Sequence, residues 1–143
     1  MKKLISFLLM GYAFSNFCFA QTENNNITIE VYNVVINGGT IFLAVFSSVE
    51  TFRKEKPDYF FELNSNSTII SQRLSLPSGE YVITAIQDAN NNRQLDFNLF
   101  GIPKELFGIT NFNGRGFPSR NFDRQKILIN NTTRNVIIKL YRF

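Results

Sequence analysis

Apolar and polar residues alternate over much of the chain, in short runs separated by clusters of Asn, Gly and Ser. The first run spans residues 27–36 and the second spans 40–47, with Asn37-Gly38-Gly39 between them. A period of two places successive side chains on opposite faces of a β-strand. Two such runs flanking Asn-Gly-Gly predict a β-hairpin.

Further strands are predicted after a short helix-like segment. Residues 48–56 predict a single helical turn in which Val49 and Phe52 face the core. Residues 67–76 predict a third strand, which stops at the turn Pro77-Ser78-Gly79.

Between Glu80 and Gln87, the side chains that would point to each face of a strand are mostly apolar. This run therefore predicts a central strand that is covered on both faces. Residues 126–129 and 136–141 predict a closing hairpin across residues 130–133. About seven short strands predict an all-β fold, an immunoglobulin-like or transthyretin-like β-sandwich. The exception is residues 88–123, a long irregular loop where we expect the functional residues.

The first 20 residues have the three parts of a secretory signal peptide. Lys2 and Lys3 are followed by an apolar run over residues 4–14 and by Cys18-Phe19-Ala20, with small residues where a signal peptidase reads. An uncleaved membrane anchor is the alternative, but the run is short for a bilayer span. We expect cleavage between Ala20 and Gln21, leaving residues 21–143 as a single secreted, periplasmic or cell-envelope domain.

Composition then excludes several kinds of chemistry. Cys18 leaves with the signal and the chain has no His, so disulfides and Ser–His or Cys–His catalysis are excluded from the mature domain. Because Lys2 and Lys3 also leave, the net charge of +4 falls by two, to +2. The remaining basic residues are scattered, so we expect no nucleic-acid binding.

The loop that follows the central strand has oxygen-bearing side chains at alternate positions. Oxygen ligands from a curling backbone suit a hard cation, and two carboxylates neutralise one calcium ion. We therefore predict a calcium site formed by the side chains at positions 1, 3, 5 and 9 of the loop and by the backbone carbonyl at position 7. A later glutamate would replace the glutamate that EF-hand calcium loops have at position 12. These residues are Asp88, Asn90, Asn92, Gln94, Asp96 and Glu105.

Two features of the loop favour other interpretations. Arg93 occupies the position where a sharp turn favours Gly, and the Asx side chains could instead cap their own backbone. The carboxylates could also form an acid–base pair for glycoside hydrolysis. Six phenylalanines recur along the irregular segment, and we expect them to pin the loop to the sandwich rather than to form a binding platform: Phe97, Phe100, Phe107, Phe112, Phe117 and Phe122.

The same part of the chain resembles a known family. The runs L-P-S-G-E-Y-V-I-T-A-I-Q-D-A-N-N-N-R-Q-L-D (76–96) and F-G-I-P-K-E-L-F-G-I-T-N (100–111) resemble bacterial domain-of-unknown-function family 2141 (DUF2141). The resemblance implies a secreted β-sandwich with no established activity. The family's two loop glycines correspond to Asn91 and Arg93. Its motif residues correspond to Asp88, Asn90, Asn92, Asp96, Gly101, Pro103, Glu105, Gly108 and Asn111.

Together these observations predict an exported, non-catalytic module that binds Ca²⁺ and presents a surface to an envelope or extracellular protein or glycan. We expect no membrane span in the mature protein. Two alternatives stay open: a carboxylate-dependent hydrolase acting on glycans, and a carrier with an apolar cavity for a small ligand.

Overall fold

The computed structural model describes residues 24–143, so the predicted signal peptide (residues 1–20) lies outside the described residues. Within this range the chain forms eight strands and two short helices, and no helix is both long and apolar enough to cross a membrane. In chain order the elements are β1 (Asn24–Tyr32), β2 (Thr40–Phe46), α1 (Val49–Arg53), β3 (Tyr59–Asn64), β4 (Ile69–Pro77), β5 (Gly79–Asp88), β6 (Leu106–Ile109), α2 (Phe122–Gln125), β7 (Ile127–Ile129) and β8 (Asn135–Lys139).

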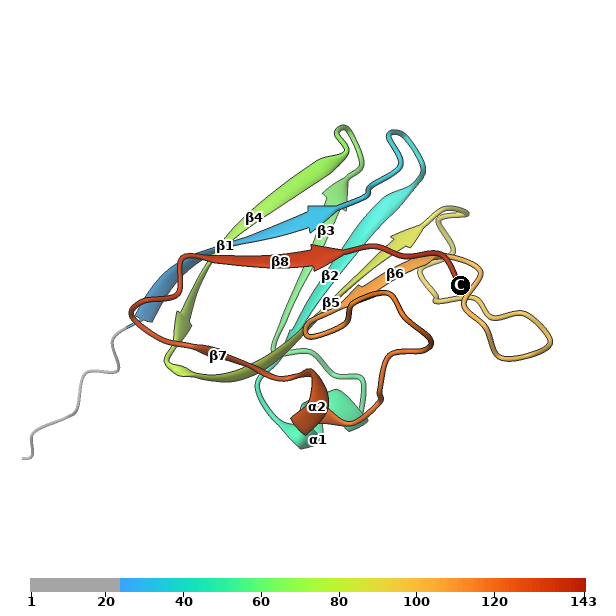
Figure 1. The fold of residues 1–143 in the computed structure, drawn as a ribbon. Helices are drawn as coiled ribbons and strands as arrows, with labels where there is room; N and C mark the ends of the chain where they lie inside the picture. The colour runs from blue at the N-terminus through green and yellow to red at the C-terminus, as the bar shows by residue number, and fades with distance from the viewer. Residues whose placement is uncertain (1–23) are drawn as a thin grey trace, which may run out of the picture.

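The strands form two packed sheets, so the prediction of an all-β sandwich is confirmed (Figure 1). One sheet has the order β4-β1-β8, in which β1 is antiparallel to β4 and parallel to β8. The other has the order β3-β2-β5-β6, and β7 pairs with the start of β5. The strand β5 is therefore central, as predicted, with β2 on one side and β6 and β7 in succession on the other.

The main core lies between the two sheets. The alternation along β1 points Ile27, Ile29 and Val31 inward, where all three are buried. They belong to one cluster with inward residues of the opposite sheet, including Leu43 and Ile83. Burial of these aliphatic side chains is the main force holding the sheets together.

A second, smaller core covers the outer face of the four-stranded path. Phe46, Val82, Ile109 and Phe122 are buried there, and the partly buried Phe52 packs against them. The helices α1 and α2 lie beside each other over this cluster (Figure 1). The predicted helical turn is thus confirmed as α1, but Val49 is exposed, and of the two residues predicted to face the core only Phe52 packs against it.

The predicted hairpin around Asn37-Gly38-Gly39 is wrong, because β1 and β2 belong to different sheets. Asn33 and Asn37 adopt left-handed backbone conformations, and these bends carry the chain across the sandwich. Val34 N–H and Asn37 N–H donate to carbonyls of the β3–β4 connection instead, at 3.1 and 2.7 Å.

The predicted closing hairpin is also wrong. The turn at Asn130–Thr133 is tight, with the N–H of Thr133 bonded to the carbonyl of Asn130 at 3.0 Å. However, β7 pairs with β5, whereas β8 pairs in parallel with β1. The turn therefore transfers the chain from one sheet to the other.

Candidate metal-binding loop

The candidate loop begins where the central strand ends. Asp88 is the last residue of β5 and is fully buried. It pairs with Thr40, and its carbonyl oxygen lies directly against Gly39. A Cβ atom on Gly39 would come within 1.9 Å of that oxygen, and the φ of +102° also favours glycine. This close approach holds the start of the loop against the start of β2.

The carboxylate of Asp88 curls the loop around itself. Its Oδ2 accepts the N–H of Arg93 at 2.7 Å, and its Oδ1 accepts the N–H of Asn92 at 3.3 Å. Asn91 and Arg93 have left-handed φ values of 56° and 64°. These are the positions that correspond to the two loop glycines of the resembled family, so the backbone keeps the shape that glycine would favour.

The next predicted residues meet at Asp96. The side-chain amides of Asn90 and Asn92 both donate to Asp96 Oδ2, at 2.7 and 3.0 Å. Their Oδ1 atoms accept the N–H groups of Asn92 and Gln94, at 3.0 and 2.9 Å. These are Asx-type turns, the alternative interpretation considered for this loop. Rotation of an amide by half a turn exchanges its nitrogen and oxygen, so the same side chains can offer oxygen to a cation.

Glu105 reaches the loop from the position just before β6. Gln87 pairs with Leu106, which makes Asp88 and Glu105 the next two residues in antiparallel register. Glu105 is 5% exposed, and its Oε2 accepts the N–H of Asp96 at 3.3 Å. Its Oε1 is buried without a hydrogen-bond partner among residues 24–143. The structure thus brings together Asp88, Asn90, Asn92, Asp96 and Glu105, whereas the Gln94 side chain is exposed.

The Glu105 carboxyl group lies within hydrogen-bonding reach of the Asp88 carboxyl group. Burial raises the pKa of Glu105, and the neighbouring negative charge of Asp88 raises it further. The N–H groups of Asp96 and Ala89 act in the opposite direction but do not cancel the effect. When both acids are ionised, two adjacent buried carboxylates repel each other, and a cation would neutralise that charge.

Arg93 does not supply that positive charge. Its guanidinium group pairs with Glu62 on β3, with Nη2 3.0 Å from Oε2. Both side chains are largely exposed, so the pair contributes little to stability. The pair also directs the Arg93 charge toward the edge of the sheet rather than toward the loop carboxylates.

The residues present define what kind of metal site is chemically reasonable. Over residues 24–143 no three Asp, Glu, Cys or His side chains are grouped to hold a metal ion. A cation here would need amide or carbonyl oxygens as well as carboxylates. Such a mixed oxygen set suits calcium rather than zinc or another metal that prefers nitrogen or sulfur ligands.

The phenylalanines of the irregular segment divide into two groups. Phe122 is buried, and Phe107 and Phe112 pack against the second core, as predicted. The prediction is wrong for Phe97 and Phe100, which are 43% and 86% exposed. Phe117 is 63% exposed but stacks on Phe143, with ring centroids 5.6 Å apart. Leu99, beside Phe100, is fully exposed. The sequence signal for this exposure is the pair Leu99-Phe100 between Asn98 and Gly101, two residue types typical of a turn.

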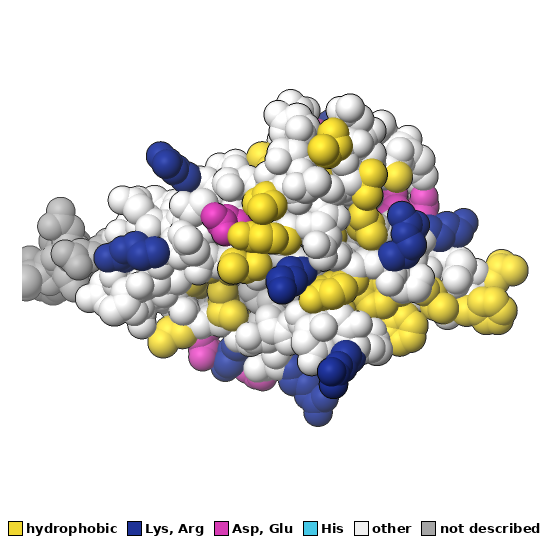
Figure 2. All heavy atoms as spheres, turned by 45° about the horizontal axis from the view of Figure 1, so that its top comes forward, with side chains coloured by type: hydrophobic (Ala, Val, Ile, Leu, Met, Phe, Trp, Pro, Cys, Tyr) yellow, Lys and Arg dark blue, Asp and Glu magenta, His cyan; other side chains and the backbone are white. Residues whose placement is uncertain are grey.

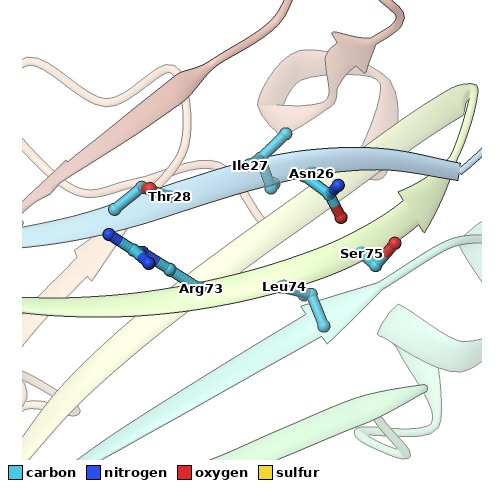
Figure 3. Close-up of a pocket in the computed structure, with 6 residues that line it drawn as sticks. All are labelled: Asn26, Ile27, Thr28, Arg73, Leu74 and Ser75. Carbon is cyan, nitrogen blue, oxygen red and sulfur yellow. The ribbon is translucent and has the colours of Figure 1, made fainter.

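Two surface hollows of the described domain lie away from this loop. One crosses three facing residue pairs on β1 and β4, drawn in Figure 3: Asn26, Ile27, Thr28, Arg73, Leu74 and Ser75. The other, at α1, is lined by Val49, Glu50, Arg53 and Lys54. Both are open, and charged or polar side chains contribute to each lining.

Comparison with known proteins identifies one family. A family model described as "Uncharacterized protein conserved in bacteria (DUF2141)" matches residues 29–137, well over half of the chain. No curated protein and no solved structure gives a significant match. The match confirms the resemblance found in the loop motifs, and the description assigns no activity to the family.

Proposed function

The chain belongs to DUF2141, a family of uncharacterized bacterial proteins, and we propose that its sandwich is a non-catalytic binding module ordered by calcium. The ion would be held by the loop between β5 and β6. Its ligands would come from the side chains of Asp88, Asn90, Asn92, Asp96 and Glu105 and from the backbone carbonyl of Gln94. The bound ion would supply positive charge that steadies the loop.

One observation carries this proposal: Glu105 Oε1 is buried and forms no hydrogen bond among the described residues, and the Glu105 carboxyl group lies beside the buried carboxyl group of Asp88. Buried polar atoms are almost always paired, and an unpaired one requires an explanation. A cation between Asp88 and Glu105 would give this oxygen a ligand and neutralise the charge. Calcium accepts such irregular oxygen sets at flexible geometry.

The proposed location suits a weak site. With cleavage near Ala20–Gln21, the module would act in the periplasm, the cell envelope or outside the cell. Extracellular calcium modules have dissociation constants of about 10⁻⁴ to 10⁻³ M. A weak calcium site in a loop with Asn91 and Arg93 in place of glycines would therefore be occupied where calcium is abundant.

The two alternatives receive less support. A glycan hydrolase needs two carboxyl groups facing each other across an open cleft. Asp88 and Glu105 are instead buried and adjacent, an arrangement that favours ligation over acid–base catalysis. An apolar carrier needs an enclosed cavity of several hundred cubic ångströms. The space between the sheets is filled by aliphatic side chains such as Leu43 and Ile83.

Thermal unfolding of residues 21–143 with calcium or with chelator tests the proposal. At ten to a hundred times the dissociation constant, calcium would add about 1.4–2.7 kcal/mol, which raises Tm by several degrees. Asp88→Ala and the milder Glu105→Gln should both remove this rise. Glu50→Gln, at an exposed site on α1, is the matched control and should keep it. Identical melting of the unmodified domain in calcium and in chelator would refute calcium binding.

A further inference from the structure

Residues 96–104 form a small hairpin that projects from the candidate loop. The N–H of Lys104 donates to the carbonyl of Asp96 at 2.8 Å, and Phe97 and Pro103 form the next rung. Beyond it, the N–H of Asn98 donates to the carbonyl of Ile102 at 2.8 Å.

The tip of this hairpin is held in one shape. Asn98 Oδ1 accepts the N–H groups of Phe100 and Ile102, at 2.9 and 3.0 Å. The N–H of Gly101 donates to the carbonyl of Asn98 at 3.0 Å, and Gly101 supplies the left-handed φ of +74°. These hydrogen bonds fix the conformation of the turn at the tip of the hairpin.

The side chains presented there are apolar and face solvent. Leu99 is 101% exposed and Phe100 is 86% exposed, with Phe97 below them at 43%. Figure 2 shows hydrophobic side chains gathered at the right-hand end of the molecule, where this segment projects in Figure 1. Single exposed apolar residues are common, but a cluster on a protruding turn marks an interaction surface.

Positive charge lies at the base of the hairpin. Residues 97–103 carry no charged side chain, whereas Lys104 follows directly. The Arg142 guanidinium lies beside it, with Nη1 3.4 Å from the Lys104 carbonyl oxygen. Lys104 and Arg142 are exposed, and neither forms an ion pair within residues 24–143. The tip is therefore apolar, and the rim behind it carries positive charge.

We propose that the hairpin docks the domain on an anionic phospholipid surface, with Leu99 and Phe100 inserted and Lys104 and Arg142 at the headgroups. At roughly 3.3 Å per residue the tip reaches about 10 Å beyond Lys104, comparable with the 5–10 Å depth of interfacial insertion. A convex apolar finger needs no matching pocket in a fluid bilayer, and basic residues are attracted to anionic lipids.

The calcium dependence of the docking rests on the proposed calcium site, because Asp96 joins the loop to the base of the hairpin. Asp96 accepts the side-chain amides of Asn90 and Asn92, and its carbonyl accepts the N–H of Lys104. Without a cation, the acids Asp88, Asp96 and Glu105 lie close to the rim and would repel anionic lipid. A bound calcium ion would remove that repulsion and strengthen docking.

Co-sedimentation of residues 21–143 with phosphatidylglycerol–phosphatidylethanolamine vesicles tests the docking, with phosphatidylcholine vesicles for comparison. In calcium we expect partition onto the anionic vesicles only. The double variant Leu99→Ser/Phe100→Ser should reduce partition at least tenfold without lowering Tm, since both side chains are exposed. Leu128→Ser, at a residue 62% exposed on β7, is the matched control and should partition normally. Equal partition of the tip variant and the unmodified domain would overturn the proposal.

A parallel melt without vesicles separates this proposal from the calcium site. A Tm that rises with calcium, together with no vesicle binding, overturns docking and leaves the calcium site standing. Vesicle binding that needs the tip but ignores chelator, with no calcium-dependent melt, supports docking and refutes the calcium site. Tip-dependent dimerisation in sedimentation velocity without vesicle binding overturns docking in favour of a second copy of this chain.

Discussion

The side-chain amide of Gln87 is bonded to the backbone of Val35 in both directions. Its Oε1 accepts the N–H of Val35 at 2.9 Å, and its Nε2 donates to the carbonyl of Val35 at 2.7 Å. Gln87 is 2% exposed on the central strand, whereas Val35 belongs to the connection that crosses between the sheets. One side chain thus replaces a rung of backbone pairing at a point where strand pairing is absent.

Replacing Gln87 with Ala should therefore be costly. The substitution removes both bonds and leaves the partly buried Val35 N–H without a partner, whereas the Val35 carbonyl still accepts the N–H of Gly38 at 3.0 Å. We expect a loss of about 2 kcal/mol in the free energy of unfolding. Urea unfolding measures it. Gln72→Ala is the matched control: among residues 24–143 the Gln72 side chain bonds only to the neighbouring Arg73 carbonyl, so its loss should change stability by less than about 0.5 kcal/mol. Similar losses in the two variants would show that the Val35 bonds contribute nothing special.

Two glycines with left-handed backbone provide a second test. Gly39→Ala would place a Cβ 1.9 Å from the Asp88 carbonyl oxygen, whereas Gly116→Ala meets nothing within 4 Å. Both substitutions bear the conformational cost of about 1 kcal/mol, but only Gly39→Ala adds a backbone clash. We expect Gly39→Ala to cost more than about 3 kcal/mol in urea unfolding, with a weaker calcium response if it folds. Equal costs would argue against the close approach.

The raised pKa of Glu105 predicts how stability depends on pH in chelator. The folded domain holds the Glu105 proton more tightly than the unfolded chain, whose ordinary pKa is 4.5. The free energy of unfolding should therefore fall as pH rises from about 4.5 through the raised pKa, and the penalty should persist at neutral pH. Glu105→Gln should remove this part of the pH dependence and stabilise the calcium-free domain at pH 7. A pH profile unchanged by Glu105→Gln would contradict the prediction.

Arg93 is expected to weaken the calcium site through its charge and to strain the loop through its backbone. Arg93→Gly and Arg93→Ala both lose the Glu62 ion pair and a positive charge, so calcium affinity should rise in both by about two- to fivefold at low salt. Only Gly relieves the φ of 64°, so the Gly variant should exceed the Ala variant by about 1 kcal/mol in stability. Calorimetric titration and urea unfolding measure the two effects. If calcium affinity is unchanged, the guanidinium lies too far from the ion to matter.

The alternation of apolar residues predicted most strand faces, because burial on one face is a local property of the sequence. It placed Ile27, Ile29 and Ile83 in or beside the core and predicted that the strand ending at Gln87 is central. Strand partners were not predictable in the same way. Asn37-Gly38-Gly39 has the composition of a hairpin turn, but side-chain bonds from Gln87 and the burial of Val34 favour a crossing between sheets.

For the site, spacing predicted which side chains gather, since alternate Asx residues curl a loop whether or not a cation is present. The structure places Glu105, the residue predicted as the distant ligand, beside Asp88. The exposure of Leu99 and Phe100 was not predictable from hydrophobicity, which favours burial of such residues. The Arg93–Glu62 pair depends on the position of β3, a strand that the pattern analysis missed.

The parallel pairing of β1 with β8 joins the beginning of the described fold to its end. Thr28 is in register with Asn135, so the first sheet stays incomplete until nearly the whole chain is available. Contacts between such distant residues make folding slow and late. A ribosome-bound chain that lacks β8 would have one unpaired edge on β1. The first sheet of such a chain lacks one of its three strands, so the sandwich can close only after residues 135–139 have been synthesised.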